Sequence, residues 1–337
     1  MGGEYSSEAM HDLEHMVRAG LARWNLPENT DVILLNISEN ATYLLQVSGA
    51  ADLILRVHRV DYCSSREIRS ELAWLVALRE EGVIETARPV PGRNGELVQE
   101  LASPSGRAAR YAVAFERLPG TEPSSDDGAT PWFLRLGELT AKMHRHAKSW
   151  QRPTFFERKR WDLDAMIGPR GYWGPWREAI GLDPAGASVL ESALTRIRAR
   201  LGRYGSAAER FGLVHADLRL ANLLIDDTQL RIIDFDDCGF SWFMYDFATG
   251  VSFIEDDPRV PALLEAWIRG YSKVARLAAE DLAEIPTLVM LRRVLLCAWL
   301  ASHREVPLAR QLGAAYTEGT VALAEAFLGG RFLAPGA

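Results

Sequence analysis

Lysine is scarce in this chain of 337 residues. Four of its 38 basic residues are lysines, and the first 141 residues contain none. Cysteine is also rare, because the chain has three cysteines that lie far apart and show no CxxC spacing. This pattern indicates neither a zinc site nor a disulfide framework, and it is typical of a cytoplasmic protein, which is the location we expect.

Long apolar runs and an excess of positive charge are missing as well. No stretch of 18 uncharged apolar residues exists, so we expect no membrane-spanning helix. The N-terminus carries acidic residues without an apolar core and does not resemble a signal peptide. The net charge of −7 gives no support to binding of nucleic acid or of an anionic membrane. The sequence leaves the oligomeric state open.

Hydrophobic spacing divides the chain into two parts. Up to residue 116 it predicts helices over residues 7–24 and 64–81, and strands over 31–35, 43–47, 52–58, 96–101 and 110–116. Residues 117–128, rich in Pro, Gly, Ser and Asp, indicate a hinge and linker. Beyond them the spacing predicts helices over 131–148, 187–204, 260–277, 286–302 and 308–328, with a strand-like island at 211–235. We therefore expect a small N-terminal lobe (1–116), mostly sheet, and a large helical C-terminal lobe (129–337).

The island at 211–235 carries the most informative residues. It contains His215-x-Asp217, then Asn222, and then Asp234. Two apolar runs lie between Asn222 and Asp234 with a short polar turn between them, which predicts a β-hairpin. Because a hairpin returns the chain to its starting point, Asn222 at its entry is expected to lie near Asp234 at its exit.

This arrangement suits phosphoryl transfer. The reaction depends on positioning and on cations that stabilise negative charge on the phosphate oxygens. Mg²⁺ prefers hard oxygen ligands, which Asn222 and Asp234 can supply. Asp217 can accept the proton of an attacking hydroxyl or orient that hydroxyl.

The order of His-x-Asp-x-x-x-x-Asn, an apolar hairpin and Ile-Asp-Phe resembles the aminoglycoside phosphotransferase and choline kinase family. This family includes type II homoserine kinases and a bacterial stress-response kinase. The resemblance implies an α+β, bilobal protein-kinase-like fold that uses ATP and Mg²⁺. It also implies that Asp217 is the catalytic base, that Asn222 and Asp234 bind the metal, and that His215 braces the loop. Asp246, in Tyr-Asp-Phe-Ala, matches the family's aspartate that holds the catalytic loop.

The nucleotide side departs from the family. Kinases of this fold place a strand lysine on the phosphates and pair it with a helix carboxylate. Here Arg56 falls at that position, with Glu71 as its expected partner and Glu67 as the competing choice. The missing lysine keeps a catalytically inactive nucleotide-binding module open as an alternative.

Two further segments resemble the family's nucleotide-binding elements. A glycine-poor turn at residues 37–41, with Ser38 and Asn40, resembles the phosphate loop, although a plain hairpin turn is an equal alternative. Glu116 and Leu118 lie at the expected interlobe hinge, where backbone groups would meet the adenine.

The acceptor is expected to be a small molecule with a hydroxyl group, such as an amino alcohol, an amino acid or an aminoglycoside. Only 11 residues separate Asp234 from Asp246, too few for the activation segment of a protein kinase. A protein Ser/Thr kinase of the stress-response type stays open, because that type is equally short here.

Several other side chains have both a functional and a structural interpretation. Acidic residues at 126–127 and 255–257 suggest a rim for a cationic acceptor, but Asp257 is better explained as the cap of a helix starting at Pro258. His144 and His146 are expected on the surface, because residues at i and i+2 do not share a helical face. Scattered aromatic residues suggest an ammonium site or, more simply, core packing: Trp161, Tyr172, Trp173, Trp176 and Trp242.

Overall fold

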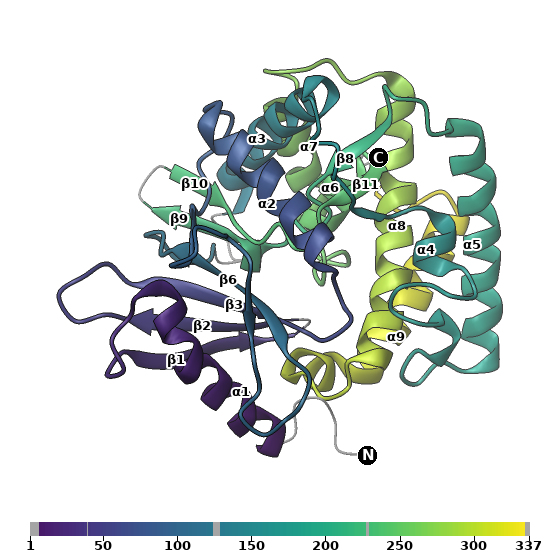
Figure 1. Ribbon diagram of the computed structural model, residues 1–337. Coiled ribbons are helices and arrows are strands. Elements are labelled where there is room, and N and C mark those ends of the chain that lie inside the picture. The colour runs from purple at the N-terminus through teal and green to yellow at the C-terminus, as the bar shows by residue number, and fades with distance from the viewer. Residues whose placement is uncertain (1–6, 39, 124–128, 227–228, 334–337) are drawn as a thin grey trace. The chain divides into compact units, whose positions relative to one another are not determined.

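The computed structural model describes residues 7–38, 40–123, 129–226 and 229–333. Its chain forms two compact units. The N-terminal unit consists of residues 1–80, 86–119 and 152–157, and the C-terminal unit of residues 81–85, 120–151 and 158–337. The fold is the predicted mixture of an antiparallel sheet in the first unit and helices in the second (Figure 1).

The N-terminal unit is built on one antiparallel sheet. Its described strands run in the order β1-β2-β3-β6-β4, and β5 also pairs with β6. The predicted strands are all present, and β4 is additional. The bounds are β1 Asp31–Ile37, β2 Asn40–Gln46, β3 Leu53–His58, β4 Pro89–Val90, β5 Gln99–Leu101 and β6 Arg110–Glu116.

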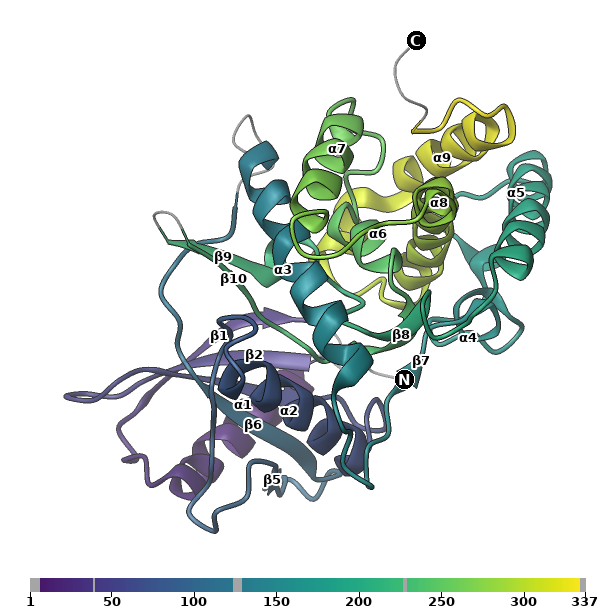
Figure 2. The same cartoon turned by 90° about the horizontal axis from the view of Figure 1, so that it is seen from above.

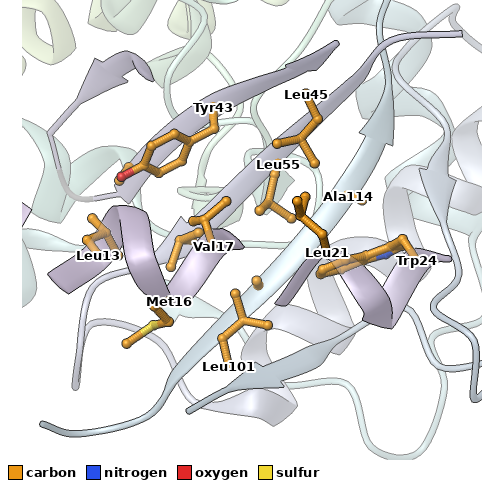
Figure 3. Close-up of a cluster of buried hydrophobic side chains, with 13 residues drawn as sticks. Leu13, Met16, Val17, Leu21, Trp24, Tyr43, Leu45, Leu55, Leu101 and Ala114 are labelled. Carbon is orange, nitrogen blue, oxygen red and sulfur yellow. The ribbon is translucent and has the colours of Figure 1, made fainter. Parts of the chain in front are cut away.

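Helix α1 (Ser7–Gly20) and the 3-10 turn η1 (Leu21–Trp24) cover one face of this sheet. The predicted apolar stripe of α1 is buried, because its residues recur at intervals of three and four. Figure 3 shows the side chains of α1 and η1 gathered over those of the strands. The labelled residues are Leu13, Met16, Val17, Leu21 and Trp24, with Tyr43, Leu45, Leu55, Leu101 and Ala114.

Helix α2 (Ser65–Glu80) is the other main helix of the N-terminal unit. It begins with a reciprocal cap, in which Ser64 Oγ accepts from the Glu67 N–H at 3.2 Å. The Glu67 carboxylate in turn accepts from the Ser64 N–H at 2.9 Å. Such a cap satisfies backbone donors of the first turn and fixes where the helix starts.

The C-terminal unit is mainly helical. Its described helices are α3 Ala129–Ser149, α4 Leu163–Ile167, α5 Pro184–Tyr204, α6 Tyr245–Gly250, α7 Val260–Tyr271, α8 Ala279–Ser302 and α9 Pro307–Leu328. Two predicted bounds were wrong. α7 ends at Tyr271, six residues before the predicted end, and α8 starts at Ala279 and continues through Pro286.

Two small sheets lie among these helices. Strands β9 (Leu223–Asp226) and β10 (Gln229–Ile232) form the predicted hairpin. β8 (Phe211–Val214) pairs with β11 (Gly239–Trp242), which also pairs in parallel with β7 (Lys159–Arg160). Both β7 and β11 were missed, because runs of two and four residues carry too little alternation to be recognised.

Helix α8 is the core helix of this unit. Among the described residues it alone is long and apolar enough to cross a membrane, judged by length and composition only, yet 83% of that window is buried inside the structure. Its buried residues include two arginines, Arg292 and Arg293. Burial of this kind is what the core helix of a folded unit shows.

Helices α3 and α7 pack backbone to backbone, and Figure 2 shows them side by side. A Cβ atom added at Gly270 would lie 1.8 Å from the Leu134 carbonyl oxygen, and one at Gly137 would lie 2.1 Å from the Trp267 carbonyl oxygen. Two glycines therefore permit this close approach.

We expect Gly270→Ala to lower the free energy of unfolding by about 1–3 kcal/mol, because the new methyl group overpacks the α3–α7 contact. Gly202→Ala on α5 is the matched control, since nothing lies within 4 Å of its added Cβ. In an exposed helix, Gly→Ala should stabilise by about 0.5–1 kcal/mol. Urea denaturation measures both, and a neutral or stabilising Gly270→Ala would contradict the packing account.

Candidate active site

The loop between β8 and β9 brings Asp217 and Asn222 together. The Nδ2 group of Asn222 donates to the Asp217 carboxylate at 2.7 Å and to the Asp217 carbonyl at 2.9 Å. Within this loop Ala216 has a φ of +66°, a conformation that non-glycine residues adopt rarely and that often accompanies functional loops.

The hairpin ties Asn222 to the residues before Asp234. The Ile233 N–H donates to the Asn222 carbonyl at 2.9 Å, which continues the β9–β10 ladder to the entry of the hairpin. Asp234 follows directly and has a φ of +63°. Asn222 and Asp234 thus flank the open end of one hairpin, as its geometry requires.

The imidazole of His215 braces the same loop from inside. Its Nδ1 accepts from the Asp217 N–H at 3.2 Å, and its Nε2 lies 3.1 Å from the Ile233 carbonyl. A neutral ring protonated at Nε2 satisfies both contacts. Burial lowers the pKa of His215, which favours this neutral form, although nearby Asp246 and Asp217 oppose the shift.

Asp246 on α6 holds the backbone of the loop. Its fully buried carboxylate accepts from the Ala216 N–H at 2.8 Å and from the His215 N–H at 3.2 Å. It also lies 2.9 Å from Nε2 of His144. One carboxylate therefore fixes the strained segment that precedes Asp217.

The expectation that His144 and His146 lie on the surface was wrong. His144 is buried between Asp246 and the Tyr271 hydroxyl, and His146 is buried near Glu81. The spacing argument showed only that the two histidines face different ways, whereas α3 is covered on more than one side. A signal was present, because His144 continues the four-residue spacing of buried Leu136 and Thr140.

The buried state of His144 makes stability depend on pH. Burial lowers its pKa below the ordinary value near 6.5, although Asp246 opposes the shift. The folded chain therefore keeps His144 neutral, while the unfolded chain takes up a proton as pH falls below about 6.5. Above that pH, His144 does not lower the free energy of unfolding. Below it, the free energy of unfolding falls by an amount that approaches about 1.4 kcal/mol per pH unit.

Urea denaturation between pH 5 and 7.5 tests this expectation. His144→Gln should show a smaller loss of unfolding free energy toward acid than the wild type. Glu255, whose pKa is raised by burial, acts in the opposite direction in both proteins, so the difference isolates His144. Equal slopes for the two proteins would contradict a neutral, buried His144.

Three groups donate to the Asp217 carboxylate. Nη2 of Arg292 reaches Oδ1 at 2.8 Å, while Arg219 Nε at 3.2 Å and Asn222 Nδ2 at 2.7 Å reach Oδ2. Burial raises the pKa of Asp217, but the charges of Arg219 and Arg292, with the hydrogen bond from Asn222, outweigh it and hold the pKa below its usual value. Asp217 is thus a carboxylate at neutral pH.

The donor set fits a magnesium ion. Among the described residues, no group of three or more His, Cys, Asp or Glu side chains is arranged to hold a metal. Mg²⁺, however, is usually held by one or two carboxylates and the substrate's phosphates. Asn222 directs its amide nitrogen toward Asp217, which leaves its oxygen for such an ion, and Asp234 adds a carboxylate. Asp237 is engaged by Lys159 at 2.9 Å, and buried Asp236 accepts from Arg158 through its carbonyl.

In the N-terminal unit, Arg56 pairs with Glu71. Nη2 of Arg56 donates to the two carboxylate oxygens at 2.6 and 2.7 Å, and both side chains are buried. Glu67, the competing choice, caps α2 instead. The guanidinium carbon of Arg56 also lies 5.2 Å from the centre of the Phe115 ring.

An apolar surface accompanies Arg56 on the sheet face opposite α1. Ile33, Leu44, Ile54 and Phe115 are successive cross-strand partners and so share one face. Arg56 lies on the same face, because its neighbours in β3 belong to the cluster under α1. Ile33 is 42% exposed, although it is a large apolar side chain. This face is therefore apolar beside a cation, and it is exposed at Ile33, whereas Leu44 and Phe115 are buried.

The other predicted nucleotide-side residues lie around this sheet. Ser38 follows β1 and Asn40 begins β2, and the Ser38 N–H donates to the Asn40 carbonyl at 2.9 Å. Position 39 lies outside the described residues. Glu116 ends β6, its N–H donates to the Arg88 carbonyl, and Leu118 follows two residues later.

The expectation that Glu255 belongs to an acidic rim was wrong. Glu255 is fully buried and pairs with Arg293 at 2.7 Å. Residues 126 and 127 lie outside the described part of the chain. Asp257 accepts from the Arg259 N–H at 2.8 Å, and α7 starts at Val260 rather than Pro258.

The aromatic residues are core side chains, with Tyr172 as the exposed exception: Trp161, Trp173, Trp176 and Trp242 are buried.

Fold and site together define a class of protein, the kinase-like phosphotransferases. Residues 34–284 match the model of the phosphotransferase enzyme family. The chain belongs to this family, so the prediction of a phosphotransferase is confirmed.

Individual relatives agree with this assignment. The structure of a microcompartment-associated aminopropanol kinase is 40% identical, covers 95% of this chain and 99% of its own, and superimposes with a TM-score of 0.88. Amicoumacin kinase of Bacillus subtilis strain 168 is 26% identical over 84% of this chain and 83% of its own. Choline kinase LicA of Streptococcus pneumoniae shares the fold, with 14% identity, a TM-score of 0.61 and coverage of 94% of this chain and 98% of its own.

Proposed function

We propose that this enzyme transfers the γ-phosphoryl group of ATP, with Mg²⁺, to a hydroxyl of a small amino alcohol. The observation that carries the proposal is the hairpin that joins Asn222 to the segment before Asp234, with Asp217 bonded to Asn222. The similarity to an aminopropanol kinase supports the amino alcohol. A structure of a related amicoumacin kinase with AMP-PNP and Ca²⁺ supports a nucleotide and a divalent metal.

In this mechanism Asp217 orients the acceptor. Its carboxylate accepts a hydrogen bond from the hydroxyl, whose oxygen attacks the γ-phosphorus while the bond to the ADP oxygen breaks. The hydroxyl proton passes to Asp217 and then to solvent. Asn222 and Asp234 would hold Mg²⁺, which when bound neutralises charge on the phosphates.

The N-terminal unit would bind the nucleotide. The apolar surface of Ile33, Leu44, Ile54 and Phe115 suits the flat face of a purine, and Arg56 suits phosphate oxygens because it stays charged. Glu71 would keep that guanidinium in place. We assign Ser38 and Asn40 to the phosphates, and the backbone at Glu116 and Leu118 to the adenine edge.

Two measurements test the proposal. ATP should raise the melting temperature more with Mg²⁺ than without it. A turnover screen should then show faster ADP release with amino alcohols than with the comparison acceptors, which are homoserine, aminoglycosides and generic proteins. Transfer to protein alone would favour a protein kinase, and nucleotide binding without any turnover would favour an inactive module.

A further inference from the structure

Arg292 is a buried charge in the middle of the apolar helix α8. Its side chain is 2% exposed, and each of its guanidinium nitrogens has a partner. Nε donates to Ser252 Oγ at 3.0 Å, Nη1 to the Tyr245 hydroxyl at 3.3 Å, and Nη2 to Asp217 Oδ1 at 2.8 Å. Burying an arginine is costly unless it is paired, so this position needs an explanation.

The neighbouring arginine provides an internal comparison. Arg293 is equally buried, but it pairs with the fully buried Glu255 and donates to Thr320 at 2.9 Å. That network links α8 to α9 and includes none of the proposed site residues. Arg292 differs, because the carboxylate it pairs with is the proposed catalytic base.

The contacts of Asp217 show what Arg292 does there. Asn222 and Arg219 donate to Oδ2, and Arg292 alone of these donates to Oδ1. A carboxylate held at both oxygens cannot rotate about its Cβ–Cγ bond. Oδ2 already accepts two hydrogen bonds, whereas Oδ1 accepts one from Arg292 and keeps a lone pair for a hydroxyl. The flat guanidinium is itself held, since its carbon lies 5.3 Å from the centre of the Trp173 ring.

We propose that Arg292 is a positioning residue, which fixes the orientation of Asp217 toward the acceptor hydroxyl. The inference rests on the proposed function. Arg292 acts through Asp217 and does not itself touch the acceptor or the nucleotide. Its planar fork places donors on three separate nitrogens, which reach Ser252, Tyr245 and Asp217 at once, whereas the three N–H groups of a lysine share one nitrogen.

The test is a double-mutant cycle with Asp217→Asn. Arg292→Met keeps most of the bulk and should lower kcat about 10²-fold, because small misplacements of a reacting group cost that much. Nucleotide affinity should stay within about threefold. In the Asp217→Asn background the same change should lower the residual kcat less than about threefold, since the carboxylate it positions is gone.

Two control variants separate positioning from general support of α8. Ser252→Ala and Tyr245→Phe each remove one other contact of Arg292 and should lower kcat less than about fivefold. If Arg292→Met fails to fold, Arg292→Lys takes its place, because it keeps the buried positive charge. Arg292→Lys should lower kcat about tenfold, and this loss should also depend on the presence of the Asp217 carboxylate.

The outcomes are distinct. Unchanged kcat in Arg292→Met, or equal losses in both backgrounds, would overturn the role of Arg292. If Asp217→Asn itself leaves turnover unchanged, Asp217 is not the base, and the positioning role of Arg292 falls with it. If the wild type shows no turnover with any acceptor, the proposed function fails instead.

Discussion

Asp217→Asn is expected to lower kcat by about 10³-fold, within the range that general-base groups contribute. The amide has nearly the same shape as the carboxylate but cannot accept the hydroxyl proton. Nucleotide affinity should change little, because we assign nucleotide binding to Arg56 and its surroundings. The measurement is steady-state ADP release with an amino alcohol, alongside nucleotide titration.

A melting-temperature measurement and a control variant distinguish a loss of catalysis from a loss of folding. The substitution removes the carboxylate that pairs with buried Arg292, so the melting temperature should fall and must be recorded. Asp226→Asn is the control, because Asp226 ends the strand β9 that follows the Asp217 loop, lies partly exposed and contacts Arg231 at 3.4 Å. Equal turnover of the wild type and Asp217→Asn would refute Asp217 as the base.

The second large effect is expected in the N-terminal unit. Glu71→Gln should lower the free energy of unfolding by about 3–5 kcal/mol, because it leaves the buried guanidinium of Arg56 without its carboxylate. Glu71 is fully buried, so little solvent is available to replace the lost partner. Urea denaturation followed by circular dichroism measures the change.

Glu67→Gln is the matched comparison, one turn earlier on the same helix. Glu67 caps α2 from a half-buried position, and a glutamine oxygen can keep this cap. Glu67→Gln therefore loses only a charge at the helix N-terminus, which should cost about 0.3–1 kcal/mol. Nucleotide affinity should fall in Glu71→Gln and stay unchanged in Glu67→Gln. Similar losses of stability in both variants would contradict the buried Arg56–Glu71 pair.

The elements with long apolar periodicity were predictable from sequence. Helix α1, the strands of the N-terminal sheet and the β9–β10 hairpin follow directly from the spacing of apolar residues and from turn chemistry. The pairing of Asn222 with the end of the hairpin was predictable for the same reason, since a hairpin has a fixed geometry.

Contacts between distant segments were not predictable. Strand β11 exists because it pairs with β8 and β7, and β7 and β11 are too short to be recognised alone. The role of His144 depends on α6 packing beside α3, which a helical spacing argument does not include. The sequence did contain one indication of the role of Arg292, because an arginine inside an apolar helix needs a buried partner. The identity of that partner, Asp217, is fixed by tertiary structure alone.

We propose that Asn222 and Asp234, at the open end of one hairpin, bind a divalent ion together with the phosphates of a nucleotide. Titration of Mn²⁺ in the presence of AMP-PNP, followed by electron paramagnetic resonance, tests it most directly, with Mn²⁺ replacing Mg²⁺. We expect Asp234→Asn and Asn222→Ala to weaken Mn²⁺ binding at least about tenfold, and Asp226→Asn to bind like the wild type. Unchanged affinity in both ligand variants would contradict the account.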